Sequence, residues 1–214
     1  MEAVKTAVHV PFVDLKAQYA AIRPEIDAAI AAVIAQTAFV GGPFVKTFDE
    51  AFARYCGVAH SVGVANGTDA IAIALMAVGV GPGDEVIVPA PSFIATAEAV
   101  TMTGAQVVFA DIDARTHNID VAQIRAKISR RTKAIVPVHL YGQPADMDPI
   151  RELADRHALR VIGDAAQAHG AHYGGRPVAA CADLTCCSFF PGKNLGAYGD
   201  AGAIVTDNPD WAAK

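Results

Sequence analysis

Short β-type runs of apolar residues recur along the chain from residue 58 onward. Most begin about 21–27 residues apart, and segments with helical spacing lie between them at 69–78, 94–102, 120–129 and 146–157. Strand–helix–strand units of this length are typical of parallel pairing. We therefore expect an open α/β fold, with a seven-stranded, mostly parallel sheet and flanking helices. The seven predicted strands are 61–65, 85–89, 106–110, 133–139, 159–163, 184–189 and 201–206.

The last two intervals depart from this rhythm. Residues 164–183 are rich in Gly and Ala, which predicts an irregular crossover. The gap between 189 and 201 is too short for a normal crossover, so the last strand is expected to be antiparallel or reached by a tight loop. Asn208 and Pro209 then predict the start of another helix.

Before residue 58 the apolar pattern is helical. A first helix is expected to open at Pro24, and Gly and Pro at 41–43 interrupt the pattern. A second amphipathic helix is expected to end at Gly57, and its aromatic side consists of Phe44, Phe48, Phe52 and Tyr55. We therefore expect an N-terminal helical segment, 1–57, ahead of a large α/β domain, 58–214.

Composition and charge exclude several functional classes. The chain has 214 residues, of which 53% are hydrophobic and 18% charged, as in a folded domain rather than a disordered one. The net charge of −5 argues against a nucleic-acid partner or an anionic membrane. Apolar stretches such as 70–78 are too short to span a bilayer, and no export signal opens the chain. We expect a cytoplasmic protein.

The cysteines predict buried, reduced thiols rather than disulfides or a metal site. None of the four lies in a C-x-x-C pair, and Cys186 and Cys187 are adjacent in an apolar run. His169 and His172 form the only short-spaced histidine pair, and no suitably spaced cysteine pair accompanies them. No metal is therefore expected.

Polar residues that follow the strands carry the candidate chemistry, because ligands of parallel sheets bind at the carboxyl ends of the strands. The first strand is followed by Asn66, Gly67, Thr68 and Asp69. Gly67 permits close backbone approach, Thr68 is a candidate helix N-cap, and a helix start suits a phosphate. An ordinary helix cap explains this turn equally well, since it is neither a Walker A loop nor G-x-G-x-x-G.

Asp164 and Lys193 follow the fifth and sixth strands. Asp164 either points a charge into the site or caps a helix. A loop lysine is usually a solvated surface charge, but apolar residues and glycines flank Lys193, which favours a partly desolvated, nucleophilic amine. Pyridoxal phosphate requires a lysine, an acid at the pyridine nitrogen and a phosphate cup. The sequence supplies all three at strand ends.

Longer motifs around these positions resemble the fold-type I pyridoxal phosphate enzymes, and among them the DegT/StrS-type nucleotide-sugar aminotransferases. The matching stretches follow one another in the family's order and are 11–15, 64–70, 91–97, 137–143, 163–171 and 188–196. The resemblance implies the fold-type I large domain and a homodimer. It also implies transfer of an amino group, usually from glutamate, to a keto group of a nucleotide-linked sugar. The resemblance favours a keto group at C3 of that sugar.

The resemblance also implies roles for the residues that match. Lys193 would hold the cofactor covalently and then move a proton, Asp164 would pair with the pyridine nitrogen, and Gln167 would hydrogen-bond the ring hydroxyl. Phe93 would stack on the ring. The residues expected at the phosphate are Gly67, Thr68 and Ser188.

Simple packing remains an alternative for Ser188 and Phe93. His139 is expected to be a hydrogen-bonded structural histidine rather than a substrate contact. Gly163 stands where many relatives carry an acidic residue. The chain is also shorter than the family pattern, so a C-terminal small domain, with an asparagine for the partner's phosphate site, is expected to be absent.

Two hypotheses therefore stay open, an active aminotransferase and a truncated, non-catalytic cofactor-binding or regulatory module. The dehydratase branch, which replaces the lysine by histidine, is disfavoured by Lys193. A nicotinamide dehydrogenase is disfavoured because no G-x-G-x-x-G follows the first strand.

Overall fold

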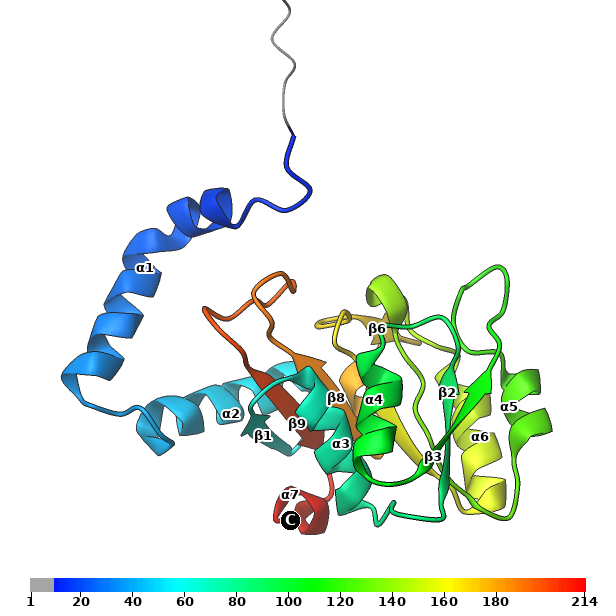
Figure 1. The fold of residues 1–214 in the computed structure, drawn as a ribbon. Coiled ribbons are helices and arrows are strands. Elements are labelled where there is room, and N and C mark those ends of the chain that lie inside the picture. The colour runs from blue at the N-terminus through cyan, green and yellow to red at the C-terminus, as the bar shows by residue number, and fades with distance from the viewer. Residues whose placement is uncertain (1–9) are drawn as a thin grey trace, which may run out of the picture. The chain divides into compact units, whose positions relative to one another are not determined.

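The computed structural model describes residues 10–214 (Figure 1), so the first nine residues of the expected N-terminal segment lie outside the described part. Contacts divide the chain into two compact units, one up to Phe44 and one from Val45 to Lys214. The functional division expected between residues 57 and 58 stays a prediction.

The first unit contains helix α1 (Leu15–Ala35) and the start of α2 (Gly42–Cys56). Asp14 caps α1, because its carboxylate accepts a 2.9 Å hydrogen bond from the N–H of Ala17. The prediction that Pro24 opens this helix is wrong. The cap at Asp14 starts the helix earlier, and the helix continues through Pro24. No residue of α1 is buried.

The second unit is built on a seven-stranded sheet of order β1-β9-β8-β5-β4-β2-β3. Neighbouring strands pair in parallel, except that β9 is antiparallel to both β1 and β8. The predicted seven-stranded, mostly parallel sheet is therefore confirmed, and of the two alternatives for the last strand the antiparallel one holds. The predicted strand 133–139 is wrong at its end, because the strand stops at Ile135. The strands are β1 (His60–Val64), β2 (Glu85–Pro89), β3 (Gln106–Ala110), β4 (Thr132–Ile135), β5 (Arg160–Asp164), β8 (Leu184–Ser188) and β9 (Gly202–Thr206).

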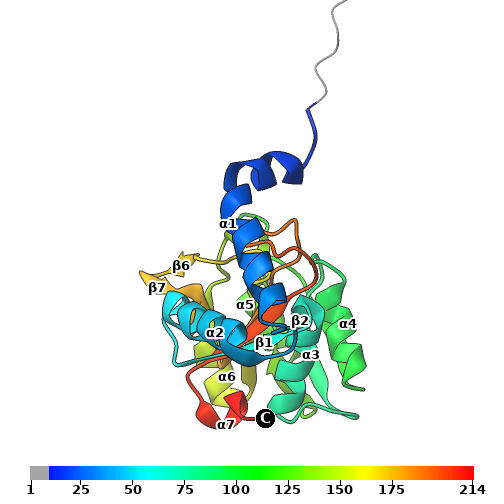
Figure 2. The ribbon, with the colours of Figure 1, turned by 90° about the vertical axis from the view of Figure 1, so that its left-hand side faces the viewer.

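Helices cover both faces of this sheet (Figures 1 and 2). On one face lie α3 (Gly67–Ala77) and α4 (Ala95–Met102), and on the other lie α5 (Val121–Lys127) and α6 (Met147–His157). The alternation of side chains along a strand produces this arrangement. Val86 and Val88 of β2 join the α3–α4 core, whereas Ile87 joins the α5–α6 core.

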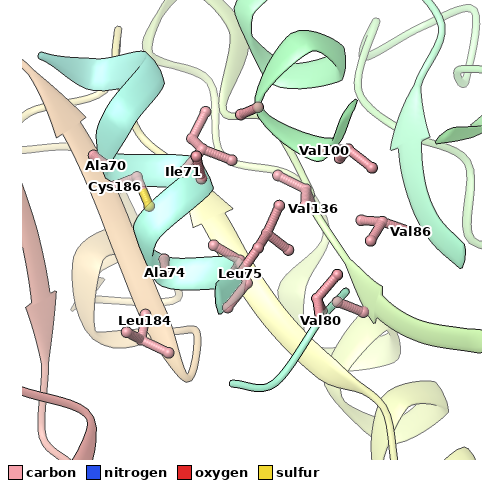
Figure 3. Close-up of a cluster of buried hydrophobic side chains, with 14 of the residues drawn as sticks. Ala70, Ile71, Ala74, Leu75, Val80, Val86, Val100, Val136, Leu184 and Cys186 are labelled. Atoms are coloured by element: carbon pink, nitrogen blue, oxygen red, sulfur yellow. The ribbon is translucent and has the colours of Figure 1, made fainter. Parts of the chain in front are cut away.

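The core beneath α3 is the one shown in Figure 3. Ile71 and Leu75 of α3 pack there with Val100 of α4, with Leu184 of β8 and with Val136, which follows β4. A third core joins the end of α2 to β8 and β9, with Phe52 and Cys56 buried. Gly57 follows α2 as predicted, with a φ of +69°, a helix-ending conformation that favours glycine.

The crossover between β5 and β8 is irregular, as predicted. It contains a two-stranded hairpin, β6 (His172–Tyr173) and β7 (Arg176–Pro177), and a 3-10 turn at Val178–Ala180. Gly174 and Gly175, both with positive φ, form the two-residue hairpin turn. After β9, Asn208 caps the short helix α7 (Pro209–Ala212), which confirms the predicted helix start.

Three further observations apply to residues 10–214. All four cysteines are buried and unpaired, as predicted. None of the helices is both long and apolar enough to cross a membrane. No three side chains among His, Cys, Asp and Glu gather in an arrangement suited to a metal ion.

His139 is a fully buried polar residue beside β5. Its Nδ1 accepts a 3.1 Å hydrogen bond from the N–H of Ala145, so the ring is neutral and carries its proton on Nε2. Nε2 has no partner in the described part of the chain and lies 3.4 Å from where a Cβ on Gly163 would stand. The predicted structural histidine is confirmed, and burial lowers its pKa from 6.5 to about 4.

Acid is expected to destabilise the chain through His139. Between pH 6.5 and about 4 the unfolded state takes up a proton there that the folded state rejects, so stability falls as the pH falls. The full effect is up to about 3 kcal/mol. His139→Asn keeps an acceptor for the N–H of Ala145 but does not titrate. Denaturant unfolding should show the advantage of the wild type over this variant shrinking toward low pH, and a constant difference would contradict the assignment.

Candidate active site

A cavity of about 630 Å³ opens at the carboxyl ends of the parallel strands. The segments that line it lie at or after the ends of β1, β2, β4, β5 and β8, and the residues that lead into antiparallel β9 join them. This is the edge at which ligands of parallel sheets bind. All seven candidate residues line it, namely Gly67, Thr68, Phe93, Asp164, Gln167, Ser188 and Lys193.

The start of α3 and the end of β8 come very close at one side of this cavity. A Cβ on Gly67 would stand 2.6 Å from Cβ of Ser188, so only glycine fits there. Gly202 of β9 pairs with Ser188, and a side chain at Gly202 would overlap the carbonyl of Asn66. Two glycines thus bring the helix start, with Thr68, next to the Ser188 hydroxyl.

Asn66 caps α3. Its Oδ1 accepts a 2.8 Å hydrogen bond from the N–H of Asp69, and its Nδ2 donates to Oδ2 of Asp69 at 2.9 Å. The prediction that Thr68 is the N-cap is wrong, because the helix already begins at Gly67. The leading N–H groups of a helix have no partner inside the helix, and here they belong to Gly67 and Thr68. This end of α3 is suited to an anion.

Asp164 ends β5 and is held through its backbone and its side chain. Its N–H donates to the carbonyl of Pro137, and its carbonyl accepts from the N–H of His139, both at 2.9 Å. The side chain is only 5% exposed. Its Oδ2 accepts a 2.8 Å hydrogen bond from the Thr96 hydroxyl, and its Oδ1 accepts one of 3.1 Å from the N–H of Ala166. Asp164 therefore does not cap a helix.

The charge of Asp164 is incompletely compensated. Burial raises the pKa of this carboxyl, while the bonds from Thr96 and Ala166 and the positive charge of Lys193 lower it without cancelling the effect of burial. A buried carboxylate of this kind is stabilised when a positively charged group enters beside it. The cavity therefore favours a ligand with a cationic N–H at this position.

Thr96 is a site residue to which the sequence analysis assigned no role. It is 2% exposed, donates to Asp164, and its hydroxyl lies 3.1 Å from that of Ser92. The sequence does contain a signal. Ser92 precedes a helix rich in alanine and Thr96 lies in its first turn, and a buried hydroxyl requires a hydrogen-bond partner.

Gln167 is oriented by the neighbouring turn. Its Oε1 accepts a 2.9 Å hydrogen bond from the N–H of Tyr141, which leaves Nε2 as its donor. Tyr141 has a φ of +55°, a left-handed conformation that is costly for a residue other than glycine. The strained backbone at Tyr141 thus places an N–H that holds the Gln167 amide in one orientation at the cavity.

Lys193 lies in the loop 190–196 between β8 and β9. Its N–H donates to the carbonyl of Phe190 at 2.8 Å, and the N–H of Ala197 donates to the carbonyl of Phe189 at 2.7 Å, which closes the base of the loop. Among the residues lining the cavity, all within the second unit, Lys193 is the only cation. Phe93 also lines the cavity and exposes 69% of its surface, so its ring is available to a ligand.

Known proteins match this chain in sequence and in fold. Over 205 residues it is 50% identical to the dTDP-3-amino-3,4,6-trideoxy-alpha-D-glucose transaminase of Streptomyces venezuelae. The matched region covers 96% of this chain and 54% of that relative. Over 207 residues it is 50% identical to the pleiotropic regulatory protein of Geobacillus stearothermophilus. This match covers 97% of this chain and 56% of that relative. The chain thus spans about half the length of the curated relatives it matches.

The solved structure of S. venezuelae DesV in complex with a ketimine intermediate superposes with a TM-score of 0.93 at 50% identity. The match covers 95% of this chain and 55% of that one. This agreement confirms the expected fold-type I architecture. The model of the DegT/DnrJ/EryC1/StrS aminotransferase family matches residues 20–214. The chain therefore belongs to the DegT/DnrJ/EryC1/StrS aminotransferase family.

Proposed function

We propose that this chain forms the cofactor-binding part of a pyridoxal phosphate-dependent aminotransferase. It would move an amino group from glutamate to a keto group of a nucleotide-linked sugar. One observation carries this proposal, namely the meeting of Lys193, buried Asp164 and the start of α3 at a single cavity. These are the amine, the acid and the anion site that the cofactor requires.

The residues present fit this cofactor in charge and in hydrogen bonding. The N–H groups at the start of α3 and the hydroxyls of Thr68 and Ser188 suit its phosphate. Asp164 suits the protonated ring nitrogen, because the carboxylate lacks a full cationic partner. The Nε2 of Gln167 suits the ring oxygen, and the exposed ring of Phe93 suits stacking.

Bound pyridoxal phosphate supplies an electron sink for the carbon that bears the donor's amine. The protein's contribution is to hold and to move protons. Lys193 would provide the amine that holds the cofactor, and with that amine free it would take up and return the proton of the carbon that bears the donor's amine. Asp164 keeps the ring nitrogen protonated, and Thr96 keeps the carboxylate from rotating away.

The name of the S. venezuelae relative supports a sugar amino group at C3 as the product. The alternative is a non-catalytic cofactor-binding or regulatory module, which the name of the G. stearothermophilus relative favours. The two differ in one reaction, the release of a keto acid from an amino acid.

We also propose that the chain forms a homodimer and acts in the cytoplasm. Helix α1 buries none of its residues, and Leu15, Ile22, Ile30 and Ile34 are exposed along it. Apolar surface of this extent is typical of a contact between proteins. Four unpaired thiols are typical of a reducing compartment.

Glutamate added to the chain loaded with pyridoxal phosphate is expected to release 2-oxoglutarate once per site. Lys193→Ala should fold normally but neither attach the cofactor covalently nor release the keto acid, because it lacks the only cationic amine at the cavity. Lys127→Ala, an exposed lysine at the end of α5, is the matched control. Cofactor binding without keto acid would support the regulatory alternative, and full activity of Lys193→Ala would refute its role.

Asp164→Asn is expected to stabilise the free chain and to weaken its response to the cofactor. Because the pKa of Asp164 is raised in the folded chain, its ionised carboxylate destabilises the fold at a pH above that pKa. The neutral amide in Asp164→Asn removes this destabilising charge. Asp183→Asn is the contrasting control, since Asp183 pairs with Arg151 at 2.7 Å and should lose stability.

Thermal melting with and without pyridoxal phosphate measures both effects. The wild type should gain more from the cofactor than Asp164→Asn does. An equal gain would show that Asp164 does not meet the ring nitrogen.

Ile30→Glu combined with Ile34→Glu should weaken self-association, because it places charges on the exposed apolar side of α1. Sedimentation velocity of the wild type and the variant would measure this, with Glu25→Gln as a control on the same helix. A wild type that stays monomeric at all concentrations would rule out the homodimer.

A further inference from the structure

A reciprocal pair of hydrogen bonds joins the Lys193 loop to the turn that follows β5. Nδ1 of His169 lies 2.7 Å from Oδ1 of Asn194, and Nδ2 of Asn194 donates to the carbonyl of His169 at 3.2 Å. Because Nδ2 is the donor of the amide, Oδ1 is its acceptor. His169 therefore carries a proton on Nδ1.

The loop 190–196 has contacts within itself and contacts to other segments. A Cβ on Gly196 would overlap the carbonyl of Pro191, and the N–H of Lys193 bonds back to Phe190. These contacts lie inside the loop and fix its shape. The side-chain hydrogen bonds of Asn194, by contrast, connect the loop to another segment of the chain, the turn that carries His169.

His169 is itself fixed from the opposite side. Its ring packs on Phe189, with ring centroids 5.5 Å apart, and on Phe52 of α2, with centroids 6.4 Å apart. Burial lowers the pKa of His169, and the positive charge of Lys193 adds to this effect, while Asn194 and Ser188 oppose it. The ring thus lies within electrostatic reach of the lysine amine whose loop it holds.

We propose that His169 and Asn194 are positioning residues that set Lys193 against the rest of the site. The inference rests on the proposed role of Lys193 in holding the cofactor. Asp164 ends β5, and the turn after it carries Gln167 as well as His169, so the pair couples the ring-binding side of the cavity to the amine. Without it, a flexible lysine on an outer loop loses its fixed approach to the ring.

Four variants test the pair. His169→Phe keeps the ring packing on Phe189 and Phe52 but removes the Nδ1 donor, and Asn194→Ala removes the other partner. The double variant shows whether the two act together, and His169→Asn restores an amide donor near the position of Nδ1. Asn208→Ala is the control, because Asn208 makes two cap bonds at α7, away from the cavity.

Two readouts are used, both on the 214-residue chain. The first is the rate at which pyridoxal phosphate becomes covalently attached to Lys193, trapped by borohydride and located by peptide mass. The second is amide hydrogen exchange of residues 190–196 without cofactor. His169→Phe and Asn194→Ala should each slow attachment about tenfold and speed exchange by a similar factor. The double variant should be no worse than either single one, and His169→Asn should recover most of the loss.

The outcomes separate the two proposals. Suppose the wild type attaches the cofactor, and His169→Phe and Asn194→Ala show the same rates of attachment and of amide exchange as the wild type. This result would overturn the inference and leave the proposed function intact. Additive losses in the double variant would also overturn it, since independent residues do not form a pair. Absence of attachment in the wild type would overturn the proposed function itself. If His169→Phe fails to fold, exposed Asn194→Ala still decides the question.

Discussion

A buried carboxylate without a full counter-charge is the constraint around which the second unit is organised. Taking an ionised carboxylate out of water costs several kcal/mol, and Asp164 recovers only part of this through Thr96, Ala166 and the charge of Lys193. The backbone bonds to Pro137 and His139 keep the residue in place despite that cost. The buried carboxylate at the edge of the sheet therefore favours the binding of a positively charged ligand.

The rest of the cavity is suited to the proposed ligand, which has an anion at one end and a cation at the other. Gly67 and Gly202 let α3 approach β8, which puts a helix N-terminus and the Ser188 hydroxyl at one side. The strained turn at Tyr141 fixes the amide of Gln167. Each device places a polar group where it cannot relax, which is typical of a binding site rather than of a stabilising core.

The apolar runs and the regular spacing between them predicted the sheet well, because most residues of the strands β2, β4, β5 and β8 are buried. Some element boundaries were missed for physical reasons. The cap at Asp14 outweighed Pro24 as a helix start. The predicted fourth strand ends at Ile135 instead of residue 139, because Pro137 has no N–H for the ladder and the chain beyond joins β5 through a single bridge at Val138.

Individual site residues could be predicted where they lie in a recognisable sequence motif. Hydrogen bonds between segments that are far apart in the sequence could not. Thr96 and Asp164 are 68 residues apart, and His169 and Asn194 are 25 apart, so no local spacing indicates either pair. A crystal structure of the chain with pyridoxal phosphate tests the central claim most directly. We predict continuous density from Nζ of Lys193 to the cofactor, with the ring nitrogen hydrogen-bonded to Asp164. A ring nitrogen turned away from Asp164, or a cofactor bound outside this cavity, would contradict the account.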